Sequence, residues 1–203
     1  MTRVLARDWP FTLEDSVNRD LAAGRTGDGN AISGFFSLVG STPIIIGVTV
    51  VAALVLRWRL HRWREPIFLC VAVAAQAVVF FFTTLAIDRA RPAVPKMDVS
   101  PPTSSFPSGH TSAAVALYAG LALVLATLVR RSWLKAAAWL LILVPVAVAI
   151  SRLYRGMHHP SDVTASFLNG AACITIAARA LLDRTVSWSR SKPSSGTRTA
   201  SHP

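Results

Sequence analysis

The stretch Ser151-Arg-Leu-Tyr-Arg-Gly-Met-His158-His-Pro-Ser-Asp162 lies between two apolar runs that are each long enough to cross a bilayer. It brings an arginine, a histidine and an aspartate into one short polar segment at the mouth of a hydrophobic helix. Charged groups at such a place are costly unless they pair or bind a ligand. The stretch is therefore a candidate site, and it also marks a connection between two membrane-spanning helices.

The order of residues in this stretch predicts its local structure. A helix is expected to begin at Pro160, because proline is favoured in the first turn and forces His159 before it into an extended conformation. His158 then lies in the loop and Asp162 in the first helical turn. From there the carboxylate can reach one ring nitrogen of His158 and leave the other free as a nucleophile. Arg152 can offer a forked pair of donors to an anion that faces this nitrogen.

Composition indicates a membrane protein. Of 203 residues, 52% are hydrophobic and 15% are charged, and the mean hydropathy is +0.46. The net charge of +11 does not indicate nucleic acid here, because the basic residues form short clusters between apolar segments. Such clusters are typical of topology signals and lipid-headgroup contacts. Cys70 and Cys173 each lie inside an apolar run, which argues against a disulfide framework or a thiolate metal site.

The apolar runs predict an all-α bundle of about five transmembrane helices. They lie at about 33–56, 66–87, 111–129, 133–150 and 163–182. Pro145 is expected to kink the fourth helix, and Pro43 the start of the first.

Basic clusters predict which way the helices run. They follow the first, third and fifth apolar runs, at Arg57, Arg59, Arg62, Arg64, Arg130, Arg131, Lys135, Arg184, Arg190 and Lys192. By the positive-inside rule these connections are cytoplasmic. The connections at about 88–110 and 151–162 then share the extracytoplasmic face. We expect an integral protein of a bacterial plasma membrane with its C-terminus in the cytoplasm.

Three segments are expected along the chain. Residues 1–30 are polar and mixed in charge, without the pattern of a signal peptide. Within them, 11–23 has apolar residues at helical spacing and is either an interfacial helix or a loosely ordered tail. Residues 31–186 form the membrane-embedded domain, and 187–203, rich in Ser, Thr and Pro, is predicted to be a disordered tail.

The other outer connection also carries unusual polar residues. It contains Asp88-Arg89-Ala-Arg91-Pro92 and then Ser104-Ser-Phe-Pro107-Ser108-Gly109-His110-Thr111. Ser108 is a good N-cap, Gly109 lets the backbone approach a ligand, and free N–H groups at a helix start bind anions. His110 is placed there to donate a proton to a leaving oxygen. Helices over 111–150 return the chain to the same face, so the two histidine segments can meet.

These segments resemble the three motifs of the type 2 phosphatidic acid phosphatase superfamily, which also contains vanadium-dependent haloperoxidases. The motif residues are Arg91-Pro92, Pro107-Ser-Gly-His110, and Ser151-Arg152 with His158 and Asp162. The resemblance implies that His158 is the nucleophile, forming a phosphohistidine, that Asp162 orients it and that His110 is the general acid. It also implies a phosphate site without a metal or other cofactor. The expected phosphate ligands are Arg91, Arg152, Ser108 and Gly109, with Arg89 as a further candidate.

Two departures from the family pattern leave alternatives open. The lysine usually found seven positions before the arginine of Arg-Pro is Thr84 here. Arg89 or Arg155 can take its place, or the site uses one cation fewer. The membrane branch usually has six spans, so we expect either a true start upstream of Met1 or a five-span core with its N-terminus outside.

Together these features predict metal-independent hydrolysis of a lipid phosphate monoester or diphosphate, such as a phosphatidic acid or an isoprenyl diphosphate. The expected partners are the lipid substrate and the membrane, with no nucleic acid and with the oligomeric state left open. One alternative is a non-catalytic protein that binds or moves anionic lipids, which Thr84 favours and the two histidines disfavour. The other is a vanadium-dependent haloperoxidase, which five apolar runs disfavour.

Overall fold

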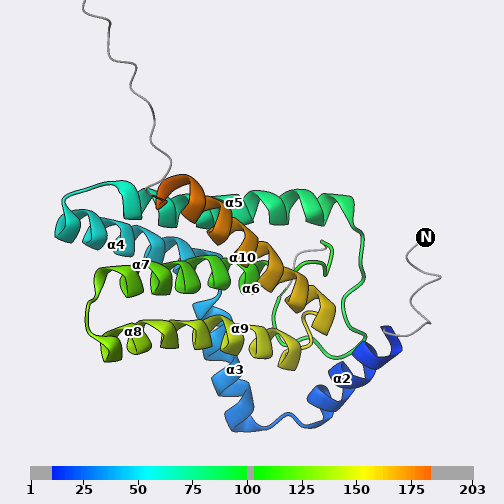
Figure 1. Ribbon diagram of the computed structural model, residues 1–203. Coiled ribbons are helices and arrows are strands. Elements are labelled where there is room, and N and C mark those ends of the chain that lie inside the picture. The colour runs from blue at the N-terminus through cyan, green and yellow to red at the C-terminus, as the bar shows by residue number, and fades with distance from the viewer. Residues whose placement is uncertain (1–10, 100–102, 184–203) are drawn as a thin grey trace, which may run out of the picture.

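The computed structural model describes residues 11–99 and 103–183, and the regular structure of these residues is entirely helical (Figure 1). The predicted all-α fold is therefore confirmed. The helices are α2 (Phe11–Ala23), α3 (Gly27–Val39), α4 (Thr42–Leu60), α5 (Arg64–Ala86), α6 (Gly109–Ala114), the π-helical η1 (Val115–Ala119), α7 (Gly120–Leu128), α8 (Ser132–Trp139), the 3₁₀-helical η2 (Leu140–Ile142), α9 (Leu143–Tyr154) and α10 (Pro160–Leu181).

Five helical stretches among the described residues are long and apolar enough to cross a membrane, as predicted. They are α4, α5, the continuous stretch Gly109–Leu128, the continuous stretch Ser132–Tyr154, and α10. Large apolar side chains on them point outward, and Leu54, Phe82 and Ile176 are 63%, 63% and 69% exposed. Water would make such exposure costly, whereas lipid does not. The protein is an integral membrane protein, and its fifth span begins at Pro160 as predicted.

The predicted start of the first span is wrong. Residues 33–39 belong to α3, which ends at Val39, and the helical structure is interrupted at Gly40 and Ser41 before α4 begins at Thr42. A Cβ atom at Gly40 would lie 2.6 Å from Cγ1 of Val148, so glycine permits this close approach. Pro43 lies in the first turn of α4, where proline is favoured. It therefore starts a helix and does not kink one.

The fourth span contains a 3₁₀ turn shortly before Pro145, the residue at which a kink was expected. The 3₁₀ turn η2 directly precedes α9, which contains Pro145 near its start. Proline has no backbone N–H to donate to the carbonyl four residues earlier, and the loss of this hydrogen bond favours a tighter turn just before it.

Residues 11–23 form the helix α2, so of the two alternatives that the sequence left open the loosely ordered tail is not what the structure shows. Glu14 is 7% exposed, and its Oε1 accepts a hydrogen bond from the backbone N–H of Ser161 at 2.7 Å. The polar N-terminal segment therefore packs on the start of α10. Residues 1–10 and the tail predicted at 187–203 lie outside the described residues.

The two connections that were expected to share one face of the membrane meet at one end of the bundle, as predicted. In Figure 1 the turns after α4 and α7 lie at one end, whereas α5 and α9 end at the other, where α10 begins. The connection between α5 and α6 bonds to the one after α9, where the N–H of Met97 donates to the carbonyl of Arg155 at 3.1 Å. The two histidine segments therefore share one site.

Candidate active site

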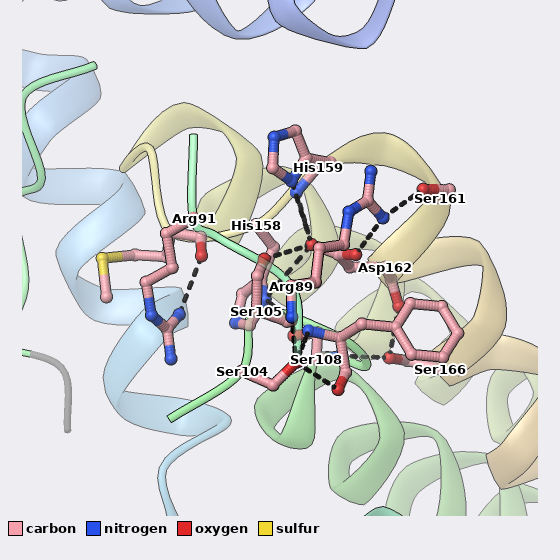
Figure 2. Close-up of polar contacts among 12 residues, drawn as sticks. Arg89, Arg91, Ser104, Ser105, Ser108, His158, His159, Ser161, Asp162 and Ser166 are labelled. Atoms are coloured by element: carbon pink, nitrogen blue, oxygen red, sulfur yellow. Dashed lines mark hydrogen bonds and ion pairs between the residues drawn. The ribbon is translucent and has the colours of Figure 1, made fainter. Parts of the chain in front are cut away.

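A backbone carbonyl orients His158. The side chain is buried, and its Nδ1 atom lies 2.7 Å from the carbonyl oxygen of Ser105 (Figure 2). A carbonyl oxygen can only accept, so Nδ1 carries the ring proton and Nε2 keeps its lone pair. Burial lowers the pKa of His158 below its ordinary value, which favours the neutral ring. His158 is thus held in the tautomer that a nucleophile needs.

Asp162 contacts His158 less directly than expected. Its Oδ2 atom lies 3.8 Å from Nδ1 of His158, which is too long for a hydrogen bond. Oδ2 instead accepts from the hydroxyl of Ser105 and from the backbone N–H of His159. Asp162 therefore holds Ser105 in place, and the backbone carbonyl of Ser105 in turn orients His158. The sequence analysis missed Ser105, because a backbone acceptor leaves no signal in residue type or spacing.

Arg89 pairs with carboxylates and does not line the cavity that the other arginines and the histidines of the motifs share. It forms an ion pair with Oδ1 of Asp162, a second one with Oε2 of Glu14 at 2.6 Å, and donates to the hydroxyl of Ser161 at 2.6 Å. Figure 2 shows its guanidinium beside Asp162 and Ser161. Arg89 therefore offsets part of the negative charge of Asp162 and ties α2 to the start of α10.

The remaining charged motif residues line one cavity of about 620 Å³, together with both histidines. Arg91, Arg152, His110 and His158 all face it. Nη1 of Arg91 donates to the carbonyl of Met157 at 2.8 Å, and burial lowers the pKa of this guanidinium while the charge of Asp162 opposes the shift. The Nε atoms of Arg91 and Arg152 are buried without a hydrogen-bond partner among the described residues. Such donors are costly to leave unpaired, and both arginine side chains line the cavity, where guanidinium groups can bind an anion.

Ser108 and Gly109, at the start of α6, have different roles at the cavity. Ser108 is fully buried, donates its backbone N–H to the hydroxyl of Ser166 at 2.8 Å and caps α6. Ser108 does not itself line the cavity but holds the start of α6 in place, whereas Gly109 lines the cavity. A Cβ atom at Gly109 would lie 3.1 Å from the ring of Phe80, so glycine lets α6 begin close to α5.

No cation replaces the family lysine among the described residues that line the cavity. The hydroxyl of Thr84 donates to the carbonyl of Phe80 within α5 at 2.8 Å. Arg155 pairs with Oδ1 of Asp98 at 2.6 Å, and Arg89 pairs as described above. The geometry favours the alternative in which the site uses one cation fewer, with Arg91 and Arg152 as its two guanidinium groups.

Apolar side chains form the other walls of the cavity. They come from α4 and α5 and include Ile45, Ile46, Val50, Val73, Ala74, Ala77 and Phe80. Polar groups at one end and an apolar wall elsewhere suit an amphipathic ligand. Within the described ranges no group of three or more His, Cys, Asp or Glu side chains could hold a metal ion.

Two solved structures share this fold. The first transmembrane PAP2 type phosphatidylglycerolphosphate phosphatase from Bacillus subtilis is 18% identical, with a TM-score of 0.79, over 93% of this chain and 92% of that one. LpxE from Aquifex aeolicus is 23% identical, with a TM-score of 0.62, over 81% of this chain and 93% of that one. At these identities the likeness shows the fold. No curated protein matches the chain.

The family itself is shown by the sequence. The model of the PAP2 superfamily matches residues 65–185, which is more than half of the chain and includes all three motif segments. The prediction of a phosphatase of this family is confirmed at the level of family and fold. The chain therefore belongs to the PAP2 superfamily.

Proposed function

We propose that the protein hydrolyses a lipid phosphate through a phosphohistidine formed on His158. The observation that carries this proposal is the orientation of His158, whose Nδ1 bonds the carbonyl of Ser105 so that the unprotonated Nε2 remains for attack. The same cavity contains His110 and two guanidinium groups. These are the parts that phosphoryl transfer needs when arginines supply the charge that a metal supplies elsewhere.

In the first step, Nε2 of His158 forms a bond to phosphorus while the bond from phosphorus to the lipid oxygen breaks. The electron pair of that bond leaves on the oxygen, and His110 donates a proton to it. Arg91 and Arg152 stabilise the negative charge of the phosphoryl oxygens in the transition state. The product is a lipid alcohol, or a lipid monophosphate if the substrate is a diphosphate.

In the second step, water attacks the phosphohistidine and His110 accepts its proton. The bond between phosphorus and Nε2 breaks, and inorganic phosphate leaves. While phosphorylated, the imidazole ring of His158 carries positive charge. The carbonyl of Ser105 at 2.7 Å and the carboxylate of Asp162 at 3.8 Å both stabilise it.

The shape of the cavity supports a lipid as the substrate. Its apolar wall lies between α4 and α5 and its charged end at the histidines, so a hydrocarbon chain and a phosphate can bind at once. The substrates we propose are a phosphatidic acid-like monoester and an isoprenyl diphosphate, and we place the reaction at the extracytoplasmic face.

Phosphate release from these two lipids tests the proposal. Detergent-purified protein is assayed with and without a chelator, beside His158→Ala and the control His61→Asn, which changes an exposed histidine in the turn after α4. His61 has a φ of 53°, which asparagine tolerates. We expect release that resists the chelator, is kept in the control and falls by about 10³-fold or more in His158→Ala, because the nucleophile is lost.

Other outcomes would contradict the proposal. Release that survives in His158→Ala excludes the phosphohistidine. Release that requires a divalent cation excludes the metal-independent mechanism. A folded protein that releases phosphate from neither lipid favours binding or transport of anionic lipids.

A further inference from the structure

A carboxylate outside the three motifs holds one of the two cavity arginines. Oδ2 of Asp98 lies 2.6 Å from Nη1 of Arg152, and its Oδ1 accepts from Nε and Nη2 of Arg155 at 2.9 and 2.6 Å. Asp98 belongs to the connection between α5 and α6, whereas Arg152 lies in α9 and Arg155 directly follows it. One side chain thus joins the two outer connections beside the cavity.

Ser37 of α3 completes this arrangement. Its hydroxyl donates to Oδ2 of Asp98 at 2.9 Å and accepts from Nη1 of Arg152 at 2.6 Å. Arg152 is only 4% exposed, and its Nε atom is buried without a partner among the described residues. Asp98 and Ser37 therefore hold the guanidinium at Nη1, and the Arg152 side chain also lines the cavity.

We propose that Asp98 is a positioning residue that holds Arg152 in place for the phosphoryl group, and this inference rests on the function proposed above. A free arginine side chain samples many rotamers, and a planar guanidinium binds an anion well only in one orientation. Because Thr84 stands where the family has a lysine, Arg91 and Arg152 are the cations that line the cavity. With only two cations in the cavity, misplacing one removes a larger share of the electrostatic stabilisation of the transition state than it would with three.

Asp98 keeps its negative charge over the pH range in which the protein would work. Burial acts to raise the pKa of Asp98, but hydrogen bonds from Arg155 and Ser37 and the charges of Arg152 and Arg155 lower it to about 2. One negative charge shared by two guanidinium groups leaves a net positive charge for the substrate. Asp98 therefore orients Arg152 without neutralising it.

The alternative is that Asp98 competes with phosphate for Arg152, and the two ideas predict opposite results for Asp98→Asn. Asparagine keeps the shape but loses the charge and places a donor NH₂ group against arginine donors. The control is Glu65→Gln, because Glu65 is also buried and pairs with Arg62 at 2.6 Å, on the turn at the other end of the bundle.

The experiment measures kcat and KM for the better lipid, inhibition by orthovanadate, and thermal unfolding with and without orthovanadate. For Asp98→Asn we expect kcat/KM to fall roughly tenfold or more, the factor that corresponds to one charge-assisted hydrogen bond. Inhibition by orthovanadate should weaken by a similar factor, and Glu65→Gln should match the wild type in both.

Three outcomes would overturn the inference or its basis. Unchanged kcat/KM and vanadate inhibition in Asp98→Asn contradict it, even if the protein unfolds at a lower temperature. Faster turnover with tighter vanadate binding supports competition instead. A wild type that neither releases phosphate nor is stabilised by orthovanadate contradicts the proposed function itself.

A second variant covers the case in which Asp98→Asn does not fold. Ser37→Ala removes the other group that holds Nη1 of Arg152 and leaves Asp98 in place. A smaller loss in the same direction supports the inference, and wild-type values for both kcat/KM and vanadate inhibition contradict it.

Discussion

The proton on Nδ1 of His158 is bound by a main-chain oxygen, so its acceptor survives any substitution at Ser105 that preserves the backbone. The position of this carbonyl depends on Asp162, which accepts from the Ser105 hydroxyl and in turn pairs with Arg89. Asp162 thus acts on the nucleophile through one intermediate residue. Arg89, which Asp162 shares with Glu14, offsets part of its negative charge and so limits how much it can raise the basicity of the imidazole.

The burial of His158 predicts the acid side of the pH profile. The nucleophile must be neutral, and burial lowers its pKa below the ordinary value of about 6.5. A lowered pKa means that the ring stays neutral as the pH falls through 6.5 and becomes protonated only below it. We therefore expect kcat/KM to hold through pH 6.5 and to fall at lower pH.

The measurement is kcat/KM against pH with a lipid monophosphate and with a lipid diphosphate. The phosphate groups of these substrates titrate differently, so a fall that belongs to His158 occurs at the same pH for both. An acid limb at or above pH 6.5 with both substrates would show that burial does not lower the pKa of the nucleophile.

The sequence predicted which residues come together in the site, but not several of the contacts that hold them. His110, His158, Arg91 and Arg152 were expected in one site from their motifs, and the structure places them around one cavity. Asp98 was not expected, because nothing in its local sequence indicates that it meets Arg152, 54 positions later. Its position depends on how the long connection between α5 and α6 folds over α9, which is a property of the tertiary structure.

At the scale of elements, glycine sets how closely the spanning helices approach. At Gly170 of α10, a Cβ atom would lie 2.6 Å from Cγ1 of Val115 and 3.1 Å from the carbonyl oxygen of Ser112. Val115 begins the π-helical segment η1, directly after the short helix that carries His110. The contact at Gly170 therefore determines where α10 lies relative to the third span.

Replacing this glycine should destabilise the bundle. We expect Gly170→Ala to lower the free energy of unfolding by about 1–3 kcal/mol, because the added methyl group overpacks a closed contact and cannot displace a backbone oxygen cheaply. Denaturant titration of the protein in mild detergent measures this. Gly47→Ala in α4 is the matched control, since a Cβ atom there meets nothing within 4 Å. A loss of stability in the control as large as in Gly170→Ala would contradict the packing argument.

The boundaries of the spans were predictable where composition decides them. The runs expected at 66–87 and 163–182 lie close to α5 and α10, because a long apolar run between polar segments has few alternatives in a membrane. The break between α3 and α4 was not predicted, although Gly40-Ser-Thr-Pro43 interrupts the apolar run with a glycine, an N-cap serine and a proline of the first turn. It depends on the fit of Gly40 against Val148, which lies in another span.

At the scale of the whole molecule, the site extends beyond the segment that the family model matches. That segment is 65–185, yet Glu14 of α2 binds Arg89 and Ser37 of α3 binds Arg152. The sequence analysis treated residues 1–30 as a separate polar segment. In the structure, α2 and α3 each hold one arginine of the site through these two contacts.

The orientation of the site in the membrane is a proposal that labelling can test. Basic clusters follow α4 and α7, so the positive-inside rule places those turns in the cytoplasm and the site outside. Two exposed, uncharged positions report on the two faces, Ala93 in the connection after α5 and Ser132 at the start of α8. Cysteines are introduced at each of them in a Cys70→Ala background, because Cys70 is exposed and Cys173 is buried.

We expect a membrane-impermeant thiol reagent to label Ala93→Cys in intact cells and Ser132→Cys only after the membrane is opened. Neither substitution changes the charge on which the topology rule depends. Labelling of Ser132→Cys alone in intact cells would place the site in the cytoplasm. The lipid would then have to present its phosphate in the inner leaflet.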